Sequence, residues 1–460
     1  MSDARGAAGA GSKGNVTMIA SGSRGDVQPQ LALGCALERA GWKVRFATHR
    51  CFESLVASAA LEFFALTGDP RHFLSGATAA QDFRDRERRP DIFQRYMKPF
   101  IRTFLRQSLA AAEGADAILY WPPIRVGPPL AEKLGIPCFG VATYPLPHCR
   151  TRHFPNPFAE PLSPGLAAAV KWPVLRQWAH LQSWRVEEKV WRGIFESEVA
   201  AWRRDVLGLT GEPAFDESRL RECVPHLLGY SAAVLPVPAD WPATLHVTGY
   251  WFHDLANGWR APDELCAFMA AGAPPVAIGF GSMVTGDDAA TDVVLEAVRR
   301  AGVRCILIRG WGGVAKRPQP AQRGDDVYVA DNVPHDWLFP QVAGVVHHCG
   351  SGTAAAGLRA ARPALPVPFG LDQFLWARRL HALGVAPPPI PRAELTAARL
   401  AAGLCELVGN AALARRAEAL GERIRRENGA LKAVEAFETH MRTAPRRASR
   451  ARVQSAMIGA

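Results

Sequence analysis

The sequence lacks the marks of several large protein classes. Its nine cysteines are scattered and form no CxxC pair, so we expect neither a disulfide framework nor a structural zinc site, and a reducing cytosol fits best. No apolar run approaches the roughly 18 residues that cross a bilayer, and the first residues, MSDARGAAGAGSKG, have no signal-peptide core. We therefore expect a cytoplasmic protein, and contact with the periphery of a membrane is left open.

The common nucleotide-binding motifs are absent as well. No loop carries the Gly-Lys-Ser/Thr of a Walker motif, and a dinucleotide fingerprint needs GxGxxG with a carboxylate about 20 residues later. The loop SGSRGDVQPQLALG has Gly22 and Gly25 without a third glycine in register, and the next strand-like run ends in Thr48 and His49. Walker-type NTP hydrolysis and NAD binding are therefore disfavoured. There is also no DxD motif and no plausible metal cluster, so no metal is expected.

The charge balance is basic. Lys+Arg number 54 against 43 Asp+Glu, a formal net charge of +11, which favours anionic partners such as nucleotides, phosphates or membrane surfaces. Several arginines cluster in the tail RTAPRRASRAR rather than in a nucleic-acid-binding motif. We therefore expect no nucleic-acid partner and a solvated tail.

Two successive alternations of strand-like and helix-like patterns organise the chain. Short apolar runs such as NVTMIA and CFGVAT in the first half, and PPVAIGF and GVVHHCG in the second, are typical of parallel strands covered on both faces. The pattern predicts an α/β protein with two doubly wound, Rossmann-like domains facing each other across a cleft. The expected segments are a flexible N-terminus (1–14), an N-terminal domain (15–238), a proline-rich linker (239–262), a C-terminal domain (263–425), a C-terminal helix (426–442) and a basic tail (443–460).

Loops at the carboxyl edges of such sheets collect ligands, and four of them have unusual composition. Asp26, beside a helix start, can be a helix-capping carboxylate or a chemical group that faces the cleft. GFGSM has small residues and the Ser282 hydroxyl, which suit an anion. In PFGLDQ, Asp372 and Gln373 supply acceptors and donors for a polyhydroxylated ligand, or Asp372 caps the next helix.

The strongest signal is VVHHCGSGTAAAGL, in which a strand runs into a small-residue turn and a helix. The N-terminus of such a helix is an anion site by geometry and dipole, and His348 and Thr353 can add donors. Because adjacent strand residues point to opposite faces, we expect one of His347 and His348 in the core and the other in the cleft, not a shared metal.

Tryptophans recur in a helical pattern between about residues 164 and 204. The stripe predicts a helical pair packed on its own domain, and the alternatives are that its aromatics line a pocket for a bulky apolar substrate or touch a membrane. Its apolar positions are Leu175, Trp178, Leu181, Trp184, Trp191, Ile194, Phe195 and Trp202.

Taken together, the stretches SRGDVQP, GFGSM, RGWGG, NVPHDWLFPQVAGVVHHCGSGT and FGLDQ resemble the UDP-dependent glycosyltransferases of family 1, which have the two-domain GT-B fold. The similarity spans roughly residues 15 to 425 and is greatest to the sterol glucosyltransferase-like branch, with its bacterial natural-product enzymes. HHCGSG and PFGLDQ depart from the usual HHGG and FFGDQ.

The resemblance implies roles for individual residues. Asp26 stands at the position of the general base, the N-terminal domain would bind the acceptor, and the C-terminal domain would bind the nucleotide sugar. The implied donor-binding residues are Ser282, Trp311, Asn332, Val333, His348, Gly350, Ser351, Gly352, Thr353, Asp372 and Gln373. For the acceptor we name Gly25, His148 and Trp178, although His148 and His153 also fit a proline-rich surface loop.

The implied reaction is an inverting, metal-independent transfer of a hexose, expected to be glucose, from a UDP-sugar to a hydroxyl of an apolar sterol, lipid or polyketide-like acceptor, without a cofactor. The open alternatives are a dTDP-sugar (rhamnosyl-type) donor, a UDP-sugar epimerase of the same architecture, and a non-catalytic partner of a transferase. A monomer or weak homo-oligomer is expected.

Overall fold

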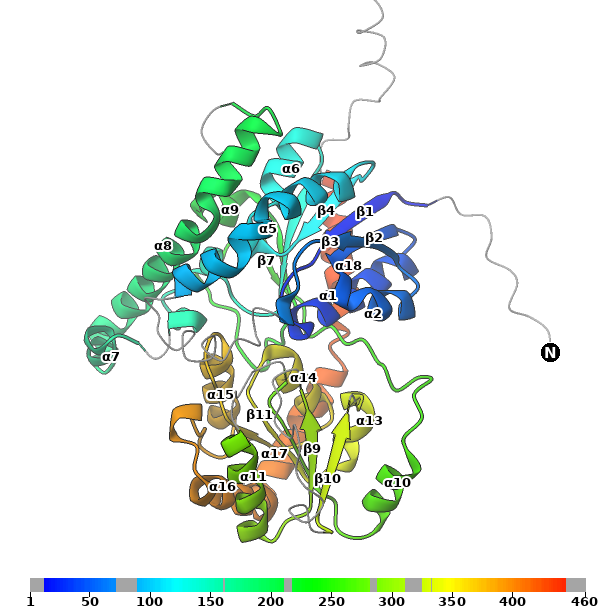
Figure 1. Ribbon diagram of the computed structural model, residues 1–460. Coiled ribbons are helices and arrows are strands. Elements are labelled where there is room, and N and C mark those ends of the chain that lie inside the picture. The colour runs from blue at the N-terminus through cyan, green and yellow to red at the C-terminus, as the bar shows by residue number, and fades with distance from the viewer. Residues whose placement is uncertain are drawn as a thin grey trace, which may run out of the picture.

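The N-terminal half forms a parallel sheet of seven strands. The computed structural model describes residues 12–71, 89–159, 162–210, 217–281, 288–310, 325–331 and 333–443. Within them the first sheet has the order β3-β2-β1-β4-β5-β6-β7 (Figure 1). Successive strands are added on one side of β1 up to β3, and on its other side from β4 onward. Ligands of doubly wound sheets bind at such a switch point in strand order. The strands are β1 (Asn15–Ile19), β2 (Lys43–His49), β3 (Glu62–Leu66), β4 (Ala117–Tyr120), β5 (Cys138–Ala142), β6 (His226–Leu228) and β7 (Leu245–Val247).

The C-terminal half forms a second parallel sheet, of five strands, with the order β10-β9-β8-β11-β12. Its switch point lies between β8 and β11, whose carboxyl ends lead into GFGSM and into HHCGSG. The two parallel sheets confirm the predicted α/β class. The strands are β8 (Val276–Gly279), β9 (Cys305–Arg309), β10 (Val327–Asp331), β11 (Gly344–His347) and β12 (Ala364–Pro366).

Helices cover both sheets (Figure 1). In the N-terminal half they are α1 (Arg24–Arg39), α2 (Glu53–Ser58), α5 (Arg89–Ala112), α6 (Gly127–Leu134), α7 (Pro164–Val170), α8 (Pro173–Asp205) and α9 (Glu217–Cys223). In the C-terminal half they are α10 (Asp263–Ala270), α11 (Asp288–Ala301), α13 (His335–Leu338), α14 (Ser351–Arg359), α15 (Gln373–Ala382), α16 (Ala397–Gly409), α17 (Ala411–Arg425) and α18 (Gly429–Thr443).

The last helix, α18, returns to the N-terminal sheet. Its Phe437 packs edge-on against Trp42 and is tilted against Phe139, with ring centroids 5.1 and 4.8 Å apart. The chain therefore passes between the two halves twice. At the crossing, Gly249 has a φ of +102°, and a Cβ on Gly429 would lie 2.5 Å from the Gly249 carbonyl carbon, so only glycine lets these two backbones touch.

The tryptophan-rich region is a short helix, α7, followed by the 33-residue helix α8. From Trp184 to Trp202 the apolar stripe is buried in the core of the N-terminal half. Before Trp184 the stripe leaves the core, since Leu175 and Trp178 are exposed. The predicted helical pair is present, but only the later part of its stripe packs on its own domain.

Among the described residues, no helix by itself has the length and hydropathy to cross a membrane. Two consecutive segments, Ala397–Gly409 and Ala411–Thr443, reach that length and hydropathy only when taken together, and the chain bends by 67° between them.

Candidate active site

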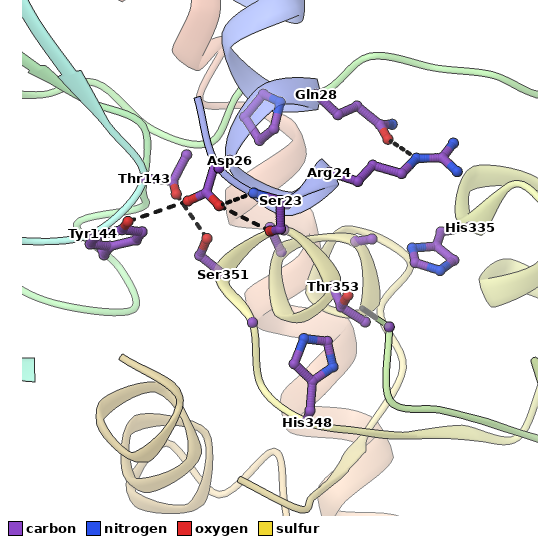
Figure 2. A pocket seen from close by; sticks show the side chains of 18 of the residues that line it. Ser23, Arg24, Asp26, Gln28, Thr143, Tyr144, His335, His348, Ser351 and Thr353 are labelled. Carbon is purple, nitrogen blue, oxygen red and sulfur yellow. Dashed lines mark hydrogen bonds between the residues drawn. The ribbon is translucent and has the colours of Figure 1, made fainter. Parts of the chain in front are cut away.

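A cavity of about 370 Å³ lies between the two halves and is lined from both. The N-terminal half contributes the loop after β1 and the residues after β5, and the C-terminal half contributes the turns after β8, β11 and β12. Figure 2 shows the start of α1, with Ser23 and Asp26, facing the start of α14, with Ser351 and Thr353. The volume of the cavity is in the range of small-molecule sites, roughly 300–1,000 Å³.

Asp26 both caps α1 and faces the cavity, the two positions that its place in the sequence allowed. It is the third residue of α1, and its Oδ2 accepts hydrogen bonds from the Ser23 backbone N–H (2.8 Å) and the Ser23 hydroxyl (2.9 Å), which closes a capping box. Its Oδ1 accepts from the Tyr144 hydroxyl at 3.3 Å on the cavity side. One carboxylate oxygen is therefore structural, and the other is available to a ligand.

Burial raises the pKa of Asp26 above the ordinary aspartate value, and the hydrogen bonds from Ser23 and Tyr144 pull it back down. The close approach of Gly22 fixes this geometry, since a Cβ at Gly22 would lie 2.6 Å from Oδ2 of Asp26. A partly desolvated carboxylate with a raised pKa is a stronger base than a solvated one.

Asp372 lines the opposite wall of the cavity. It precedes α15, but its side chain does not cap that helix, because its Oδ2 accepts a hydrogen bond from the Trp376 indole N–H at 2.8 Å. Burial, with a smaller contribution from the negative charge of Asp26, raises the pKa of Asp372 to about 7. The charge of Asp26 thus acts on the Asp372 carboxyl group, which lines the same cavity.

Gln373 uses its side-chain oxygen within its own loop. Oε1 accepts from the backbone N–H groups of Phe369 (2.8 Å) and Gly370 (3.2 Å). This leaves the side-chain NH₂ as the part of Gln373 that can donate to a ligand. Leu371, which lies between Gly370 and Asp372, has a φ of +56°. The departure from the usual FFGDQ pattern therefore coincides with a left-handed residue in this turn.

The histidine pair divides as expected. His347 is buried and its Nδ1 accepts from the backbone N–H of Cys349 at 3.0 Å, whereas His348 lines the cavity. Burial lowers the pKa of His348 to about 4, with a further contribution from His335. His348 is therefore neutral near pH 7 and can donate from one ring nitrogen only. Within the described part of the chain, no group of three His, Cys, Asp or Glu side chains is placed to hold a metal ion.

Glycines hold His348 in place from both sides. A Cβ at Gly281 would lie 2.6 Å from its Cε1, and one at Gly350 would lie 2.5 Å from its Nε2. A Cβ at Gly310 would in turn meet the Gly281 carbonyl oxygen at 1.7 Å. Gly281, Gly310 and the segment His348–Gly350 thus pack directly against one another.

The start of α14 also contacts the N-terminal half. The Ser351 and Thr143 hydroxyls are hydrogen-bonded at 2.8 Å across the cavity, and a Cβ at Gly352 would lie 3.7 Å from the backbone of Gly25. Both Ser351 and Thr353 line the cavity. Because the N-termini of α1 and α14 meet here, two positive helix ends point into one cavity, an arrangement that suits an anion.

The remaining wall near α8 is apolar. It is formed by aromatic side chains, among them Tyr144, which contacts Asp26. Two of them, Trp191 and Phe195, come from the tryptophan-rich helix α8. The pocket-lining alternative therefore holds for these two residues. The aromatic wall consists of Phe100, Trp121, Tyr144, Phe158, Trp191 and Phe195.

Two acceptor candidates lie elsewhere. His148 is buried and stacked on His226, with ring centroids 3.7 Å apart, so it neither lines the cavity nor lies on the surface. Trp178 is exposed and is outside the cavity, whereas Gly25 lines it. Among the donor candidates, Val333, Gly350 and Gly352 line the cavity, and Ser282, Trp311 and Asn332 lie outside the described residues.

Several lining residues were missed from the sequence. Tyr144 follows β5, and its position at the carboxyl end of a parallel strand is a signal that could have identified it. Arg24, His335 and Arg359 also line the cavity. His335 is stacked on Phe339 at 4.4 Å, and burial lowers its pKa to about 4. Arg24 and His335 lie within the stretches SRGDVQP and NVPHDWLFPQVAGVVHHCGSGT, which could have identified them, whereas no sequence signal points to Arg359.

Comparisons with known proteins agree with this architecture. Residues 16–155 match the Glycosyltransferase family 28 N-terminal domain, and residues 314–430 match the Erythromycin biosynthesis protein CIII-like, C-terminal domain. A solved glycosyltransferase of kitacinnamycin superposes with a TM-score of 0.66 at 22% identity, over 94% of this chain and 99% of that one, which supports the GT-B fold.

Two curated relatives are similar over nearly the whole chain. Sterol 3-beta-glucosyltransferase of Yarrowia lipolytica is 35% identical over 92% of this chain, which spans only 28% of that protein. Sterol 3-beta-glucosyltransferase UGT80B1 of Arabidopsis thaliana is 34% identical over 93% of this chain and 68% of its own length. This chain therefore belongs to the family 1 glycosyltransferases with the GT-B fold, in the sterol-glucosyltransferase type.

Proposed function

We propose that this protein transfers glucose from UDP-glucose to the hydroxyl group of a sterol-type acceptor, with inversion at the anomeric carbon and with Asp26 as the general base. The observation that carries the proposal is the position of Asp26. Its Oδ1 lies between an aromatic wall and the N-terminus of α14, where an apolar alcohol and a diphosphate would meet.

The acceptor side of the reaction rests on Asp26 and Tyr144. An acceptor seated against the aromatic wall would present its hydroxyl to Asp26 Oδ1, which takes the proton as the oxygen attacks the anomeric carbon. Because Oδ2 is held by Ser23 and Oδ1 by Tyr144, the carboxylate needs no reorientation at the moment of reaction, a condition that favours catalysis.

The donor side rests on the C-terminal half. As the new bond to the acceptor oxygen forms, the bond from the anomeric carbon to the phosphate oxygen breaks and negative charge develops on UDP. The N–H groups at the start of α14, the Thr353 hydroxyl and the neutral His348 imidazole would stabilise that charge. We propose that this group of donors makes a metal ion unnecessary.

The sugar is proposed to lie against Asp372 and Gln373. With its pKa raised to about 7, the Asp372 carboxyl can accept or donate a hydrogen bond with a hexose hydroxyl, and the free NH₂ of Gln373 can donate another. The similarity to sterol 3-beta-glucosyltransferases supports glucose and a sterol.

The test is a product analysis with the whole chain. UDP-glucose and cholesterol should yield a β-linked steryl glucoside and equimolar UDP, measured by mass spectrometry and NMR, also in the presence of EDTA. Replacing UDP-glucose by dTDP-glucose or dTDP-rhamnose tests the alternative donors. Epimerised UDP-sugar without any glycoside, or no turnover with any donor, would contradict the proposal.

A further inference from the structure

An unusually exposed apolar segment lies at the junction of α7 and α8. Every residue of Lys171–Trp178 is exposed, and four of them are large and apolar. Trp172 is 68% and Val174 is 90% exposed, which is rare for side chains of this size in one contiguous segment. We call Trp172, Val174, Leu175 and Trp178 the interfacial patch.

Helix geometry joins these side chains into one surface. Trp172 is the N-cap of α8 and Pro173 is its first residue. Val174 and Trp178 are four residues apart and Leu175 and Trp178 three apart, so the three lie on one face. Val186, also exposed, continues that face two turns further on. Figure 1 shows α7 and the first turns of α8 projecting at the left of the N-terminal half, away from its sheet.

The sequence segment that carries the interfacial patch has charge of one sign. The segment 163–186 contains no Asp or Glu, and its Lys171, Arg176 and Arg185 are all exposed. A segment that combines exposed tryptophan and aliphatic side chains with Lys and Arg, and that contains no carboxylate, is typical of a surface that lies in the interface of an anionic bilayer. Interfaces with other proteins are instead depleted of lysine.

The same helix connects this surface to the cavity. Trp191 and Phe195 of α8 form part of the aromatic wall, and at 1.5 Å per residue Trp191 is about 20 Å along the helix from Trp178. A bilayer touching the start of α8 would thus lie one helix segment away from the apolar side of the cavity. This step rests on the proposed function, because only a membrane-borne acceptor makes the proximity useful.

We propose that the interfacial patch, with Lys171, Arg176 and Arg185 around it, docks this protein on the surface of a bilayer that carries anionic headgroups. Tryptophan side chains enter the headgroup region and the cations contact lipid phosphates. The contact is peripheral, and it brings the acceptor side of the cavity to the membrane in which a sterol-type alcohol resides.

The test is vesicle binding by the whole chain, which requires no catalysis. Vesicles of phosphatidylcholine with phosphatidylglycerol should co-sediment the protein and shift its tryptophan emission to shorter wavelength, while phosphatidylcholine alone should bind it more weakly. Trp172→Ser with Val174→Ser should lower the partition coefficient at least about tenfold. Lys171→Glu with Arg185→Glu should lower it by a similar factor and abolish the preference for phosphatidylglycerol.

The matched control is Val408→Ser with Leu431→Ser, two exposed apolar side chains outside the patch, which should leave binding unchanged. The Trp172 and Val174 variant should keep its turnover of a detergent-solubilised sterol and lose turnover of the same sterol in vesicles. Unchanged vesicle binding in the Trp172 and Val174 variant would overturn the proposal. So would a concentration-dependent dimer, detected by light scattering, that this variant abolishes, since the patch would then be a contact between copies of the chain.

Discussion

Substitution of Asp26 by asparagine isolates the chemistry of its Oδ1 from the structural role of its Oδ2. Asparagine can place its carbonyl oxygen where Oδ2 accepts from the Ser23 N–H and hydroxyl, so the start of α1 should lose less than about 1 kcal/mol of stability. The NH₂ group then faces the cavity and cannot accept a proton. Removal of a general base lowers kcat by roughly 10²–10⁴-fold.

The assay measures kcat with UDP-glucose and a solubilised sterol, the Kd of UDP by calorimetry, and the melting temperature. UDP affinity should stay within about threefold, because the groups proposed to bind the diphosphate lie in the C-terminal half. A kcat within a few-fold of wild type, with folding intact, would refute the assignment of Asp26 as the base.

The pH profile supplies a second check on the same residue. Because burial raises the pKa of Asp26 and the base must be ionised, kcat/KM should rise with pH to a plateau, with its acid limb above the ordinary aspartate value. Ser23→Ala removes a hydrogen bond that lowers this pKa, so the acid limb should move to higher pH. An acid limb that does not respond to Ser23→Ala belongs to another group.

Three further substitutions test the other walls of the cavity. Tyr144→Phe removes the hydroxyl that is 3.3 Å from Asp26 Oδ1; kcat should fall roughly tenfold and the acid limb should move to higher pH, whereas a change in KM alone would argue against a role beside the base. His348→Ala should weaken UDP binding at least about tenfold in calorimetry, and, with the pKa near 4, wild-type affinity should not depend on titration of this side chain around neutrality. Asp372→Asn should raise the donor KM. Above pH 7 the melting temperature of this variant should also be higher than that of wild type. Because the folded-state pKa of Asp372 is raised to about 7, ionisation of its carboxyl group opposes folding as pH rises through that value. The difference in melting temperature should vanish at low pH, where Asp372 is protonated in both the folded and the unfolded state.

Much of the site was predictable because strand order alone brings its parts together. The loops after β1, β8, β11 and β12 each follow the carboxyl end of a parallel strand, and three of them lie at switch points. Asp26, His348 and Asp372 were therefore expected near one cleft. The division of His347 and His348 between core and cavity likewise followed from the alternation of a strand.

What escaped prediction depends on packing between segments that are distant in sequence. His148 was placed in a surface loop because proline-rich loops are usually exposed, yet it is buried against His226, more than seventy residues away. Trp178 belongs to a helical stripe whose later members are buried, and periodicity does not reveal where a long helix leaves its domain. Tyr144 lies in no recognisable motif, and its place beside Asp26 becomes visible only in the structure.

The dual use of Asp26 explains why local pattern could not decide between capping and chemistry. A capping carboxylate uses one oxygen and is held rigidly by the helix start, and that rigidity is what a general base requires of its second oxygen. The same economy applies to Gln373, whose Oε1 fixes its loop while its NH₂ stays available. At both positions the structural interpretation and the functional one are compatible, because an amide or carboxylate has two polar atoms. A carboxylate or amide side chain at the start of a helix can therefore cap that helix with one polar atom and face a binding cavity with the other.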